Sequence, residues 1–236
     1  MKEPSSSHFT TISPQDLAPP QVHQLILSIV IPRPIGLIST LSSEGVPNLA
    51  PFSFFQAVAA QPPSLLFCPN RDRTGRPKHS LLNAQATKEF VANTVTEEMA
   101  EKINYASGEF PEEVNEFDEA GLTPLPSLIV RPFRVAESPV QMECRVLKIV
   151  EISSLPLGGS VVIGEIVQLH IREDLLLPNK PMVSLEHYKP ISRLGGISYG
   201  LLREFFDMPR PQMTPDGRYV VEGSHRIVTP PYRLDR

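Results

Sequence analysis

Hydrophobic side chains recur at every second position along two long stretches in the second half of the chain. Residues 140–151 and 161–171 both follow this pattern, with polar side chains such as Glu143 on the opposite face. A period of two is typical of β-strands, whose successive side chains point to opposite faces. A glycine pair at residues 158–159 lies between the stretches and is typical of a turn. The pattern therefore predicts two long antiparallel strands joined by a glycine turn.

Shorter apolar runs in the first half of the chain predict further strands. Residues 33–40 and 48–60 flank a turn and are expected to form a hairpin of two long strands, and residues 64–68 and 89–95 follow. Strands that are partly apolar on both faces suit a closed barrel better than an open sheet. We therefore expect a barrel.

Helical patterns are few and short. Residues 21–31 predict one or two helical turns, and residues 79–88 predict a short helix. Thr96, followed by two glutamates, is typical of a helix start, because acidic side chains there face the positive end of the helix dipole. The acidic stretch 107–121 is interpreted as a solvated surface segment. The fold class predicted is mainly β with a few short helices.

Proline is the unusual feature of the composition, with 26 of 236 residues. Because proline lacks an amide donor and costs about 3 kcal/mol inside a helix, long-helix bundles and coiled coils are excluded. Hydrophobic residues make up 41% of the chain, which suffices for a globular core. We divide the chain into a flexible lead-in (residues 1–20), one domain (residues 21–207) and an extended C-terminal arm (residues 208–236).

The charge pattern excludes several classes of partner. A formal net charge of −4 gives no electrostatic footprint for nucleic acid or for an anionic membrane. No apolar run approaches the roughly 20 residues of a membrane span, and the polar N-terminus does not resemble a secretory signal. We expect a cytoplasmic protein with no nucleic-acid or membrane partner. Cys68 and Cys144 give no disulfide framework, and the six histidines are scattered, so no metal site is predicted.

Several catalytic fingerprints are missing from the sequence. It contains no G-x-G-x-x-G, no P-loop, no H-E-x-x-H and no G-x-S-x-G. These absences weaken assignment as a dinucleotide-binding dehydrogenase, an NTPase, a metallohydrolase or an esterase. They leave open a ligand that is held mainly by backbone groups.

The first candidate segment joins hydroxyl groups to aromatic rings on the predicted hairpin. Its members are Ser39, Thr40, Pro51, Phe52, Ser53 and Phe54. Hydroxyls beside aromatic faces suit a ring with an apolar body and a polar edge. A proline inside a strand implies a bulge or a sheet edge, which frees backbone groups for a ligand. The alternative is an ordinary core strand with the two phenylalanines inward.

The second candidate segment is a basic loop just before the predicted helix 79–88. Lys78 and Ser80 stand where the helix begins, and a helix N-terminus supplies unpaired N–H groups and a partial positive charge. These two side chains can clamp a phosphate. The alternative is a solvated basic loop, and the next phosphate candidates in that loop are Arg71, Arg73 and Arg76.

The third candidate segment follows the long strands. It contains Arg193, Gly195, Gly196 and Tyr199. Adjacent glycines permit positive φ and close approach of the backbone to a ligand. Arginine adds charge, and tyrosine adds a ring with a hydroxyl. A plain turn is the alternative.

Taken in order, these motifs resemble the flavin reductase-like family of flavoproteins, from about residue 20 to residue 205. The matching segments are Pro32-Arg33-Pro34-Ile35, Ser39-Thr40, Gly45-Val46-Pro47-Asn48-Leu49-Ala50-Pro51-Phe52-Ser53-Phe54-Phe55, Lys78-His79-Ser80-Leu81 with Asn83, Glu89-Phe90-Val91 with Asn93, Glu116-Phe117 with Ala120-Gly121-Leu122-Thr123-Pro124, Glu137-Ser138-Pro139-Val140, and Arg193-Leu194-Gly195-Gly196 with Tyr199. The resemblance implies a Greek-key-like, FMN-binding split β-barrel with polar terminal extensions. It also implies a homodimer with one flavin per subunit near the subunit interface.

The same resemblance assigns roles to the candidate residues. It places Ser39, Thr40, Ser53 and Phe54 along the isoalloxazine ring and assigns the phosphate to Lys78 and Ser80. Residues 193–199 would close over the ligand, with Tyr199 as a gate at the flavin face. The remaining motif residues of the cofactor site are Pro51, Phe52 and Asn93. The family usually has Asp-Thr where this chain has His79-Ser80. Serine keeps the hydroxyl, whereas histidine removes an acidic group beside the phosphate.

Two hypotheses of function follow from this resemblance. The first is an NAD(P)H-dependent flavin reductase-like oxidoreductase, in which FMN, with FAD as the weaker candidate, passes electrons to a small acceptor or to free flavin. The second is an FMN-binding electron carrier without substrate turnover, which docks a protein partner through the acidic stretch 109–119. A dimeric interaction module that has lost its ligand is a third and weaker hypothesis.

Overall fold

A computed structural model gives the fold of the chain. It describes residues 8–207, 210, 212–213, 219–220 and 227–228. The chain divides into a body of residues 1–200 and a second unit of residues 201–236. Most of the predicted C-terminal arm, residues 208–236, lies outside the described residues, so its extended form stays a prediction.

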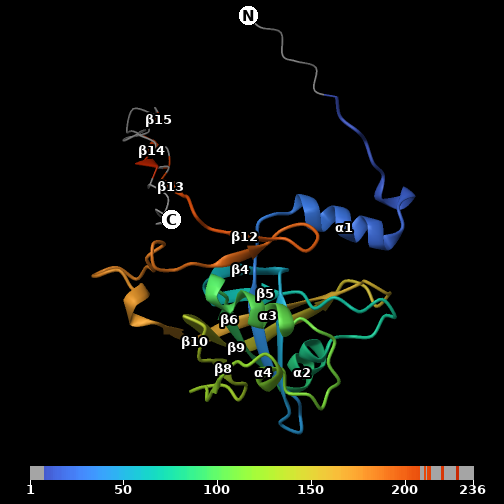
Figure 1. Ribbon diagram of the computed structural model, residues 1–236, viewed down its shortest axis with the longest axis horizontal. Helices are drawn as coiled ribbons and strands as arrows, with labels where there is room; N and C mark the ends of the chain where they lie inside the picture. Colours follow the sequence, from blue (N-terminus) through green and yellow to red (C-terminus); the bar gives the residue numbers. More distant parts are fainter. Residues whose placement is uncertain (1–7, 208–209, 211, 214–218, 221–226, 229–236) are drawn as a thin grey trace, which may run out of the picture. The chain divides into compact units, whose positions relative to one another are not determined.

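The body is built around one seven-stranded antiparallel sheet (Figure 1). The strand order is β3-β2-β6-β9-β10-β5-β4. The strands are β2 (Gly36–Leu41), β3 (Pro47–Phe52), β4 (Phe55–Ala60), β5 (Pro63–Phe67), β6 (Glu89–Thr94), β9 (Val140–Glu151) and β10 (Ser160–Ile171). The two long strands predicted from the period-two pattern are confirmed as β9 and β10, which pair along their whole length.

The remaining elements are short. The helices are α1 (Pro19–Ile29), α2 (His79–Thr87), α3 (Ala100–Tyr105) and α4 (Glu116–Glu119), with 3₁₀ turns at Pro14–Asp16, Glu97–Met99 and Glu173–Leu175. A three-stranded sheet joins β1 (Arg33–Pro34), β11 (Ile191–Arg193) and β12 (Tyr199–Leu201), and a ladder pairs β7 (Pro124–Leu125) with β8 (Arg134–Val135). In the second unit β13 (Phe206–Asp207) pairs with β16 (Ile227–Val228), and β14 (Gln212–Met213) with β15 (Tyr219–Val220). The prediction of a mainly β fold with a few short helices is confirmed.

The predicted long strand 48–60 is wrong, because the chain turns a corner at Ser53 and Phe54. β3 and β4 flank this corner, yet they form the two opposite edges of the sheet. Two residues span no more than about 7 Å of chain, so the two edges must come together there. The sheet is therefore curled into a barrel whose seam, between β3 and β4, is not closed by strand pairing.

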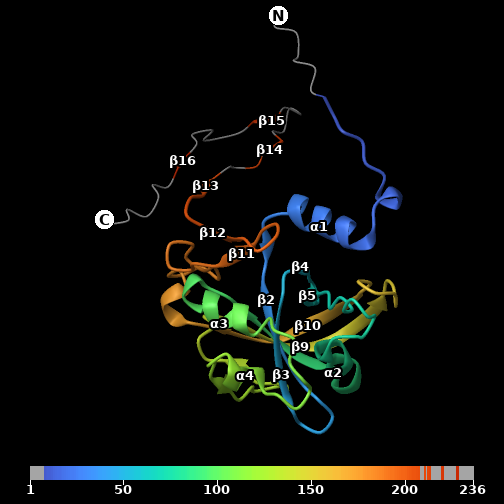
Figure 2. The same cartoon turned by 45° about the vertical axis from the view of Figure 1, so that its right-hand side comes forward.

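Two hydrophobic clusters lie on the two faces of β2, which explains why every residue of that strand is buried. Ile38 and Phe90 belong to the cluster inside the barrel, which α2 helps to cover. Leu37 and Phe117 belong to a second cluster under α3 and α4. Figure 2 shows α3 and α4 on one side of β2 and α2 on the other.

The outer edge of β3 offers no free amide. Residues two apart in an antiparallel strand direct their backbone groups to the same side. The Leu49 amide points away from β2, because it donates to Glu116 at 3.0 Å. Pro47 and Pro51 share this outward side and have no N–H at all. The expectation that a proline in this region marks a sheet edge is therefore confirmed, and the edge presents only carbonyl acceptors.

Helix α1 begins at Pro19, within the segment that we predicted as a flexible lead-in. Proline is tolerated in the first turn of a helix, where the amide would lack an acceptor in any case. The double proline therefore starts this helix and does not end a linker. No helix in the described residues is long and apolar enough to cross a membrane.

Candidate functional site

A cavity of about 450 Å³ opens between the β3 edge and the start of α2. Its walls come from β3, from residues 76–80, from residues 106–111 and from Glu116. Several of its lining side chains are ionisable, so we name it the charged cavity. Its volume lies within the range of about 300–1,000 Å³ that is typical of small-molecule sites.

The start of α2 supplies hydrogen-bond donors to this cavity. Lys78 is the N-cap residue, and its side chain makes no capping hydrogen bond. The amides of His79 and Ser80 have no partner among the described hydrogen bonds, because the first amides of a helix lack acceptors one turn earlier. The Lys78 ammonium lies 3.6 Å from Glu109, but this pair is exposed and contributes little stability.

Ser80 is almost fully buried and belongs to a small polar network. Its hydroxyl accepts a hydrogen bond from the Asn48 amide at 2.9 Å, and the same amide group donates to Thr40 at 3.0 Å. Asn83 of α2 also donates to Thr40, at 3.1 Å. Since the Ser80 hydroxyl accepts from Asn48, its own proton is free to be donated to a ligand. Asn48 and Asn83 belong to the segments that match the family, but no role was predicted for them, because their role comes from contacts across the fold.

Two of the three arginines proposed as alternative phosphate ligands, Arg71 and Arg76, already bind other groups, and Arg73 does not line the cavity. Asp72 accepts hydrogen bonds from Thr74 and from the Arg76 side chain. The hydrogen bond from the Thr74 hydroxyl, followed by those from Arg76, holds the pKa of Asp72 well below its usual range. Arg71 binds the Gly75 carbonyl and Glu151. These contacts leave Lys78 as the cation best placed to meet an anion in the charged cavity.

Glu116 also lines the charged cavity. One carboxylate oxygen, Oε2, accepts the Leu49 amide, and the residue is only 6% exposed. Its other oxygen, Oε1, has no partner among the described residues. Burial raises the pKa of Glu116, while the Leu49 hydrogen bond and the nearby charge of His79 act in the opposite direction. The interpretation of residues 107–121 as wholly solvated is therefore wrong at Glu116 and Phe117, which are buried.

Three predicted site residues lie inside the fold. Ser39, Thr40 and Asn93 are each 0% exposed. Asn93 donates to the Leu37 carbonyl and accepts the Val135 amide, so both ends of its side chain are used by the backbone. The Ser39 hydroxyl is buried with no hydrogen-bond partner among the described residues. A ligand at the surface cannot reach these three side chains in this structure.

Ser53 and the segment 193–199 are connected through Arg33. This buried guanidinium donates to the Ser53 hydroxyl at 3.3 Å and to the Leu194 carbonyl at 2.9 Å. It also donates to the Leu27 and Val30 carbonyls and so caps the end of α1. The sequence motif Pro32-Arg33-Pro34 therefore has a structural basis, since one side chain fastens α1, the barrel corner and the β11–β12 turn together.

Gly195 and Gly196 shape that turn and do not line the charged cavity. A Cβ at Gly195 would lie 3.1 Å from the Ser28 backbone of α1, and Gly196 has a φ of +59°. Arg193 stacks over the Tyr199 ring at 4.5 Å, and the Tyr199 hydroxyl donates to Asn104 at 3.3 Å. The role of Tyr199 as a gate stays a prediction.

A second cavity, of about 610 Å³, lies between the N-terminal segment and the β9–β10 turn. None of its lining residues is Asp, Glu, Lys or Arg, so we name it the apolar cavity. Phe54 lies in its wall, whereas Pro51 and Phe52 lie in the wall of the charged cavity. The predicted aromatic segment is thus divided between two cavities on either side of Ser53.

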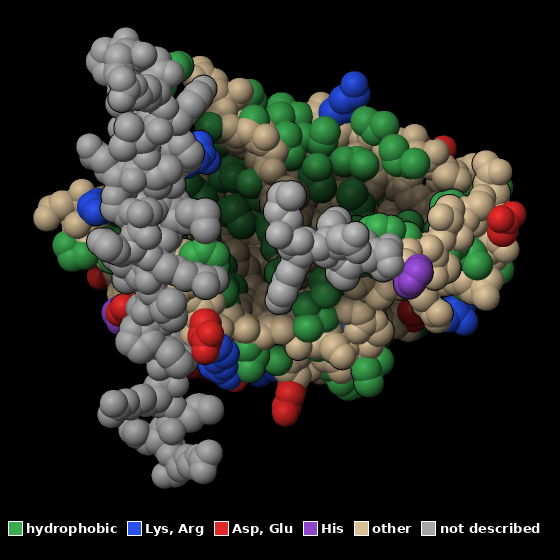
Figure 3. Space-filling model, turned by 90° about the horizontal axis from the view of Figure 1, so that it is seen from above, with side chains coloured by type: hydrophobic (Ala, Val, Ile, Leu, Met, Phe, Trp, Pro, Cys, Tyr) green, Lys and Arg blue, Asp and Glu red, His purple; other side chains and the backbone are tan. Residues whose placement is uncertain are grey.

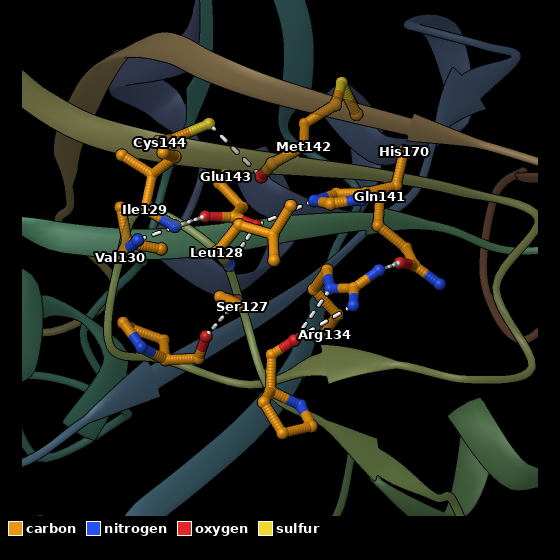
Figure 4. Close-up of polar contacts among 12 residues, drawn as sticks. Ser127, Leu128, Ile129, Val130, Arg134, Gln141, Met142, Glu143, Cys144 and His170 are labelled. Carbon is orange, nitrogen blue, oxygen red and sulfur yellow. Dashed lines mark hydrogen bonds and ion pairs between the residues drawn. The ribbon is translucent and has the colours of Figure 1, made fainter.

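One further buried carboxylate lies away from both cavities. Glu143 is 0% exposed and accepts the amides of residues 128, 129 and 130, at 2.8, 2.6 and 3.0 Å (Figure 4). The Nε2 atom of His170 lies 2.7 Å from the Oε1 atom of Glu143. Although burial opposes ionisation, the three amides and His170 together lower the pKa of Glu143. The polar face predicted for β9 is therefore covered here by the loop between β7 and β8.

The described residues contain no group of three or more His, Cys, Asp or Glu side chains that could hold a metal ion. The charged cavity instead suits an organic anion. Ammonium, hydroxyl and helix amides gather at one end, and Pro51 and Phe52 provide an apolar wall. These residues fit a phosphorylated ligand with a flat apolar body, such as a flavin nucleotide.

Comparison with known proteins also supports a flavin as the ligand. A family model described as the flavin reductase like domain matches residues 28–191. A protein of Aquifex aeolicus is 42% identical over 178 residues, which cover 75% of this chain and 88% of that protein. A protein of Halalkalibacterium halodurans is 34% identical over 210 residues, which cover 86% and 97% of the two chains.

Solved structures share the fold. Nitrilotriacetate monooxygenase component B from Bacillus cereus is 31% identical, with a TM-score of 0.81 over 86% of this chain and all of that one. The 2-nitrobenzoate 2-nitroreductase of Pseudomonas fluorescens is 31% identical, with a TM-score of 0.77 over 87% and 98% of the two chains. A Shewanella frigidimarina protein with a split barrel domain, 21% identical, has a TM-score of 0.72 over 83% and 95% of the two chains and shows the shared fold.

Proposed function

This chain belongs to the flavin reductase-like family, and from that premise we propose that it is an FMN-binding oxidoreductase that takes electrons from NAD(P)H and passes them to a small acceptor. The observation that carries the proposal is the charged cavity. It joins the phosphate-binding features of the α2 start to an apolar wall formed by Pro51 and Phe52.

We assign the phosphate of FMN to Lys78, to the Ser80 hydroxyl and to the first amides of α2. Hydrogen bonds between these groups and a phosphate dianion are charge-assisted and therefore stronger than neutral ones. Arg76 already binds Asp72, which leaves one well-placed cation and favours the single phosphate of FMN over the diphosphate of FAD. Pro51 and Phe52 would pack against the ring system.

We leave Ser39, Thr40 and Asn93 out of the proposed contacts because they are fully buried. Thr40 has a positioning role, since it accepts hydrogen bonds from Asn48 and Asn83 beside Ser80. When bound, FMN would supply the two-electron chemistry that connects the nicotinamide with the acceptor. The protein's own residues hold the phosphate and shield one side of the ring from water.

The acceptor is proposed from chemistry and from similarity. One neighbour at 31% identity reduces 2-nitrobenzoate, which makes small aromatic molecules reasonable acceptors to test alongside oxygen and free flavin. The acidic stretch 109–119 offers exposed carboxylates at Glu112 and Glu113, which the carrier hypothesis would use for docking. Turnover measurements separate these two functions.

The test begins with the absorbance spectrum of the purified protein and with identification of any released flavin. Oxidation of NADH and of NADPH is then followed at steady state, with and without added FMN and with a nitroaromatic acceptor. The reductase proposal requires a turnover rate that saturates with increasing NADH or NADPH concentration. Bound FMN that neither nucleotide reduces would support the carrier function, and failure to bind any flavin at micromolar concentration would end both.

We further propose that the chain forms a homodimer through the face that carries α1 and β4. Val58 of β4, Ile29 of α1 and Ile197 expose 48%, 66% and 92% of their surface. Figure 3 shows hydrophobic side chains gathered around a hollow on the face that lies uppermost in Figure 1. A contiguous apolar surface beside an unpaired edge strand is typical of an interface between subunits. Light scattering of wild type and of Val58→Glu tests the proposal, because the substitution should give monomers.

The cellular compartment is also a proposal. Cys68 and Cys144 are both free thiols, and burial raises the pKa of each. Reduced, unreactive thiols are typical of cytosolic proteins, so we place this protein in the cytoplasm. Fractionation of cells that express the tagged chain would test this placement.

A further inference from the structure

The charged cavity is lined by hydrogen-bond donors and by acceptors. Donors lie at the start of α2, where Lys78, Ser80 and the helix amides meet. Among the acceptors, Glu109 and Asp72 already pair with Lys78 and Arg76, whereas Glu116 is in no described ion pair. The β3 edge adds no donor, because Pro51 has no N–H and the Leu49 amide is taken by Glu116. A ligand that satisfies both sets of groups carries an anion for the start of α2 and a hydrogen-bond donor for Glu116.

Glu116 is the buried carboxylate of this lining. Its Oε2 atom is fixed by the Leu49 amide at 3.0 Å, which orients the whole carboxylate. No described hydrogen bond uses its Oε1 atom, and this atom is not among the fully buried polar atoms that lack a partner, so it is open to the cavity. A ligand group that donates to it makes a charge-assisted hydrogen bond.

The electrostatic surroundings select the kind of donor. A phosphate at Glu116 would meet a like charge, and a cationic group in the cavity would meet Lys78, Arg76 and His79, which also line it. Hydroxyl groups are neutral donors, so they are repelled neither by the carboxylate nor by the cations. We propose that Glu116 forms a polyol subsite, in which its free oxygen accepts a hydrogen bond from a hydroxyl of the ribityl chain. This subsite rests on the proposed binding of FMN.

The proposal is tested by shortening the ligand as well as the side chain. FMN, riboflavin and lumiflavin share the ring system, but riboflavin lacks the phosphate, and lumiflavin lacks both the phosphate and the ribityl chain. Dissociation constants are measured by flavin fluorescence for wild type, Glu116→Gln and Lys78→Ala. Glutamine keeps an oxygen for the Leu49 amide and replaces the free oxygen with an NH₂ group. Glu119→Gln, an exposed change in the same helix, is the matched control.

The subsite predicts a specific pattern of affinities. Glu116→Gln weakens FMN and riboflavin by about tenfold, as expected for a hydrogen bond to a charged acceptor, and leaves lumiflavin within twofold. Lys78→Ala weakens FMN alone. Wild type binds riboflavin more tightly than lumiflavin, a comparison that does not depend on the folding of any variant.

Other outcomes overturn the proposal in distinguishable ways. If Glu116→Gln weakens all three ligands equally, the residue acts through the fold or the ring, and no polyol subsite exists. The same conclusion follows if riboflavin binding is unchanged in Glu116→Gln, or if wild type does not distinguish riboflavin from lumiflavin. If wild type binds none of the three flavins, the proposed function fails together with the subsite.

Discussion

Glu143 and Glu116 are two buried carboxylates whose oxygens are used in different ways. Glu143 accepts three backbone amides and contacts His170, so both of its oxygens are occupied. Glu116 accepts one amide and keeps its second oxygen at the wall of a cavity. The difference teaches that burial of an acid does not by itself indicate function. A saturated carboxylate holds the fold, whereas a half-occupied one has bonding capacity left for a ligand.

The two carboxylates also differ in their ionisation. Amide donors and His170 outweigh the effect of burial at Glu143 and lower its pKa. Burial dominates at Glu116 and raises its pKa, because the amides of Leu49 and of Glu116 itself, with the nearby charge of His79, compensate the loss of water only in part. The number of donors therefore decides which charge state the fold prefers.

The largest expected effect is on folding stability, from Glu143→Gln. The new NH₂ group would replace one of the two oxygens, so either the Leu128 amide or the amides of Ile129 and Val130 would lose their acceptor inside the protein. Such a loss costs about 3 kcal/mol of unfolding free energy, measured by urea denaturation. The matched variant Glu116→Gln should cost less than about 1 kcal/mol, because it removes no bond within the fold. Equal losses of unfolding free energy in the two variants would refute the distinction between a saturated and a half-occupied carboxylate.

The next effect is on ligand binding at the donor end of the charged cavity. Lys78→Ala and Ser80→Ala each remove one contact to the proposed phosphate, and we expect each to weaken FMN binding about tenfold or more. Arg73→Ala, in the same loop but outside the cavity lining, is the control. The measurement is fluorescence titration with FMN. Unchanged affinity in both variants would move the phosphate to another part of the protein.

A smaller loss of stability is expected from His170→Gln. Glutamine can still donate to Glu143, but it does not place the donor as the imidazole ring does, and the three amides remain in place. We expect a loss of about 1 kcal/mol at neutral pH, measured by thermal or urea denaturation. A loss as large as that of Glu143→Gln would mean that the histidine, and not the amides, stabilises the carboxylate.

The smallest effects are in the pH dependence, where the two carboxylates should have opposite signs. A lowered pKa means that the contribution of Glu143 is present above its unfolded-state pKa of about 4.3 and is lost as pH falls through the folded value. A raised pKa means that the contribution of Glu116 is present at low pH and declines as pH rises above about 4.3. The free energy of unfolding of Glu116→Gln should therefore rise relative to that of wild type, by less than about 1 kcal/mol, as the pH increases from 4 to 7. Denaturation curves across that range provide the measurement.

Much of the fold follows from local patterns in the sequence. The strands β9 and β10 were predictable because hydrophobic residues alternate over their whole length, and α2 because an apolar segment follows a basic loop. The corner at Ser53 and Phe54 was not predictable from the same patterns. Residues 48–60 keep strand-like composition throughout, and only the pairing of β4 with β5 shows that the chain changes edges.

The site was predicted less completely, for a physical reason. Lys78 and Ser80 come together with Pro51 and Phe52 as expected, because a helix start and a proline-containing edge strand carry local signals. Asn93 and Thr40 are used by backbone and amide partners far away in the sequence, which no local pattern reports. Glu116 was hidden in an acidic run. Its place in the family motif Glu116-Phe117 was a signal that set it apart from the neighbouring acids, but that match gave it no role.

The two edges of the large sheet differ in one respect that limits how many copies can join. Along β3, Pro47 and Pro51 have no amide and Glu116 holds the amide of Leu49, so a foreign strand would meet carbonyl acceptors there but no donor. β4 contains no proline. A sheet with one open and one obstructed edge can pair with a further strand only at the open edge. Extension into long ribbons is therefore opposed by Pro47, Pro51 and Glu116, and the last two of these residues also line the charged cavity.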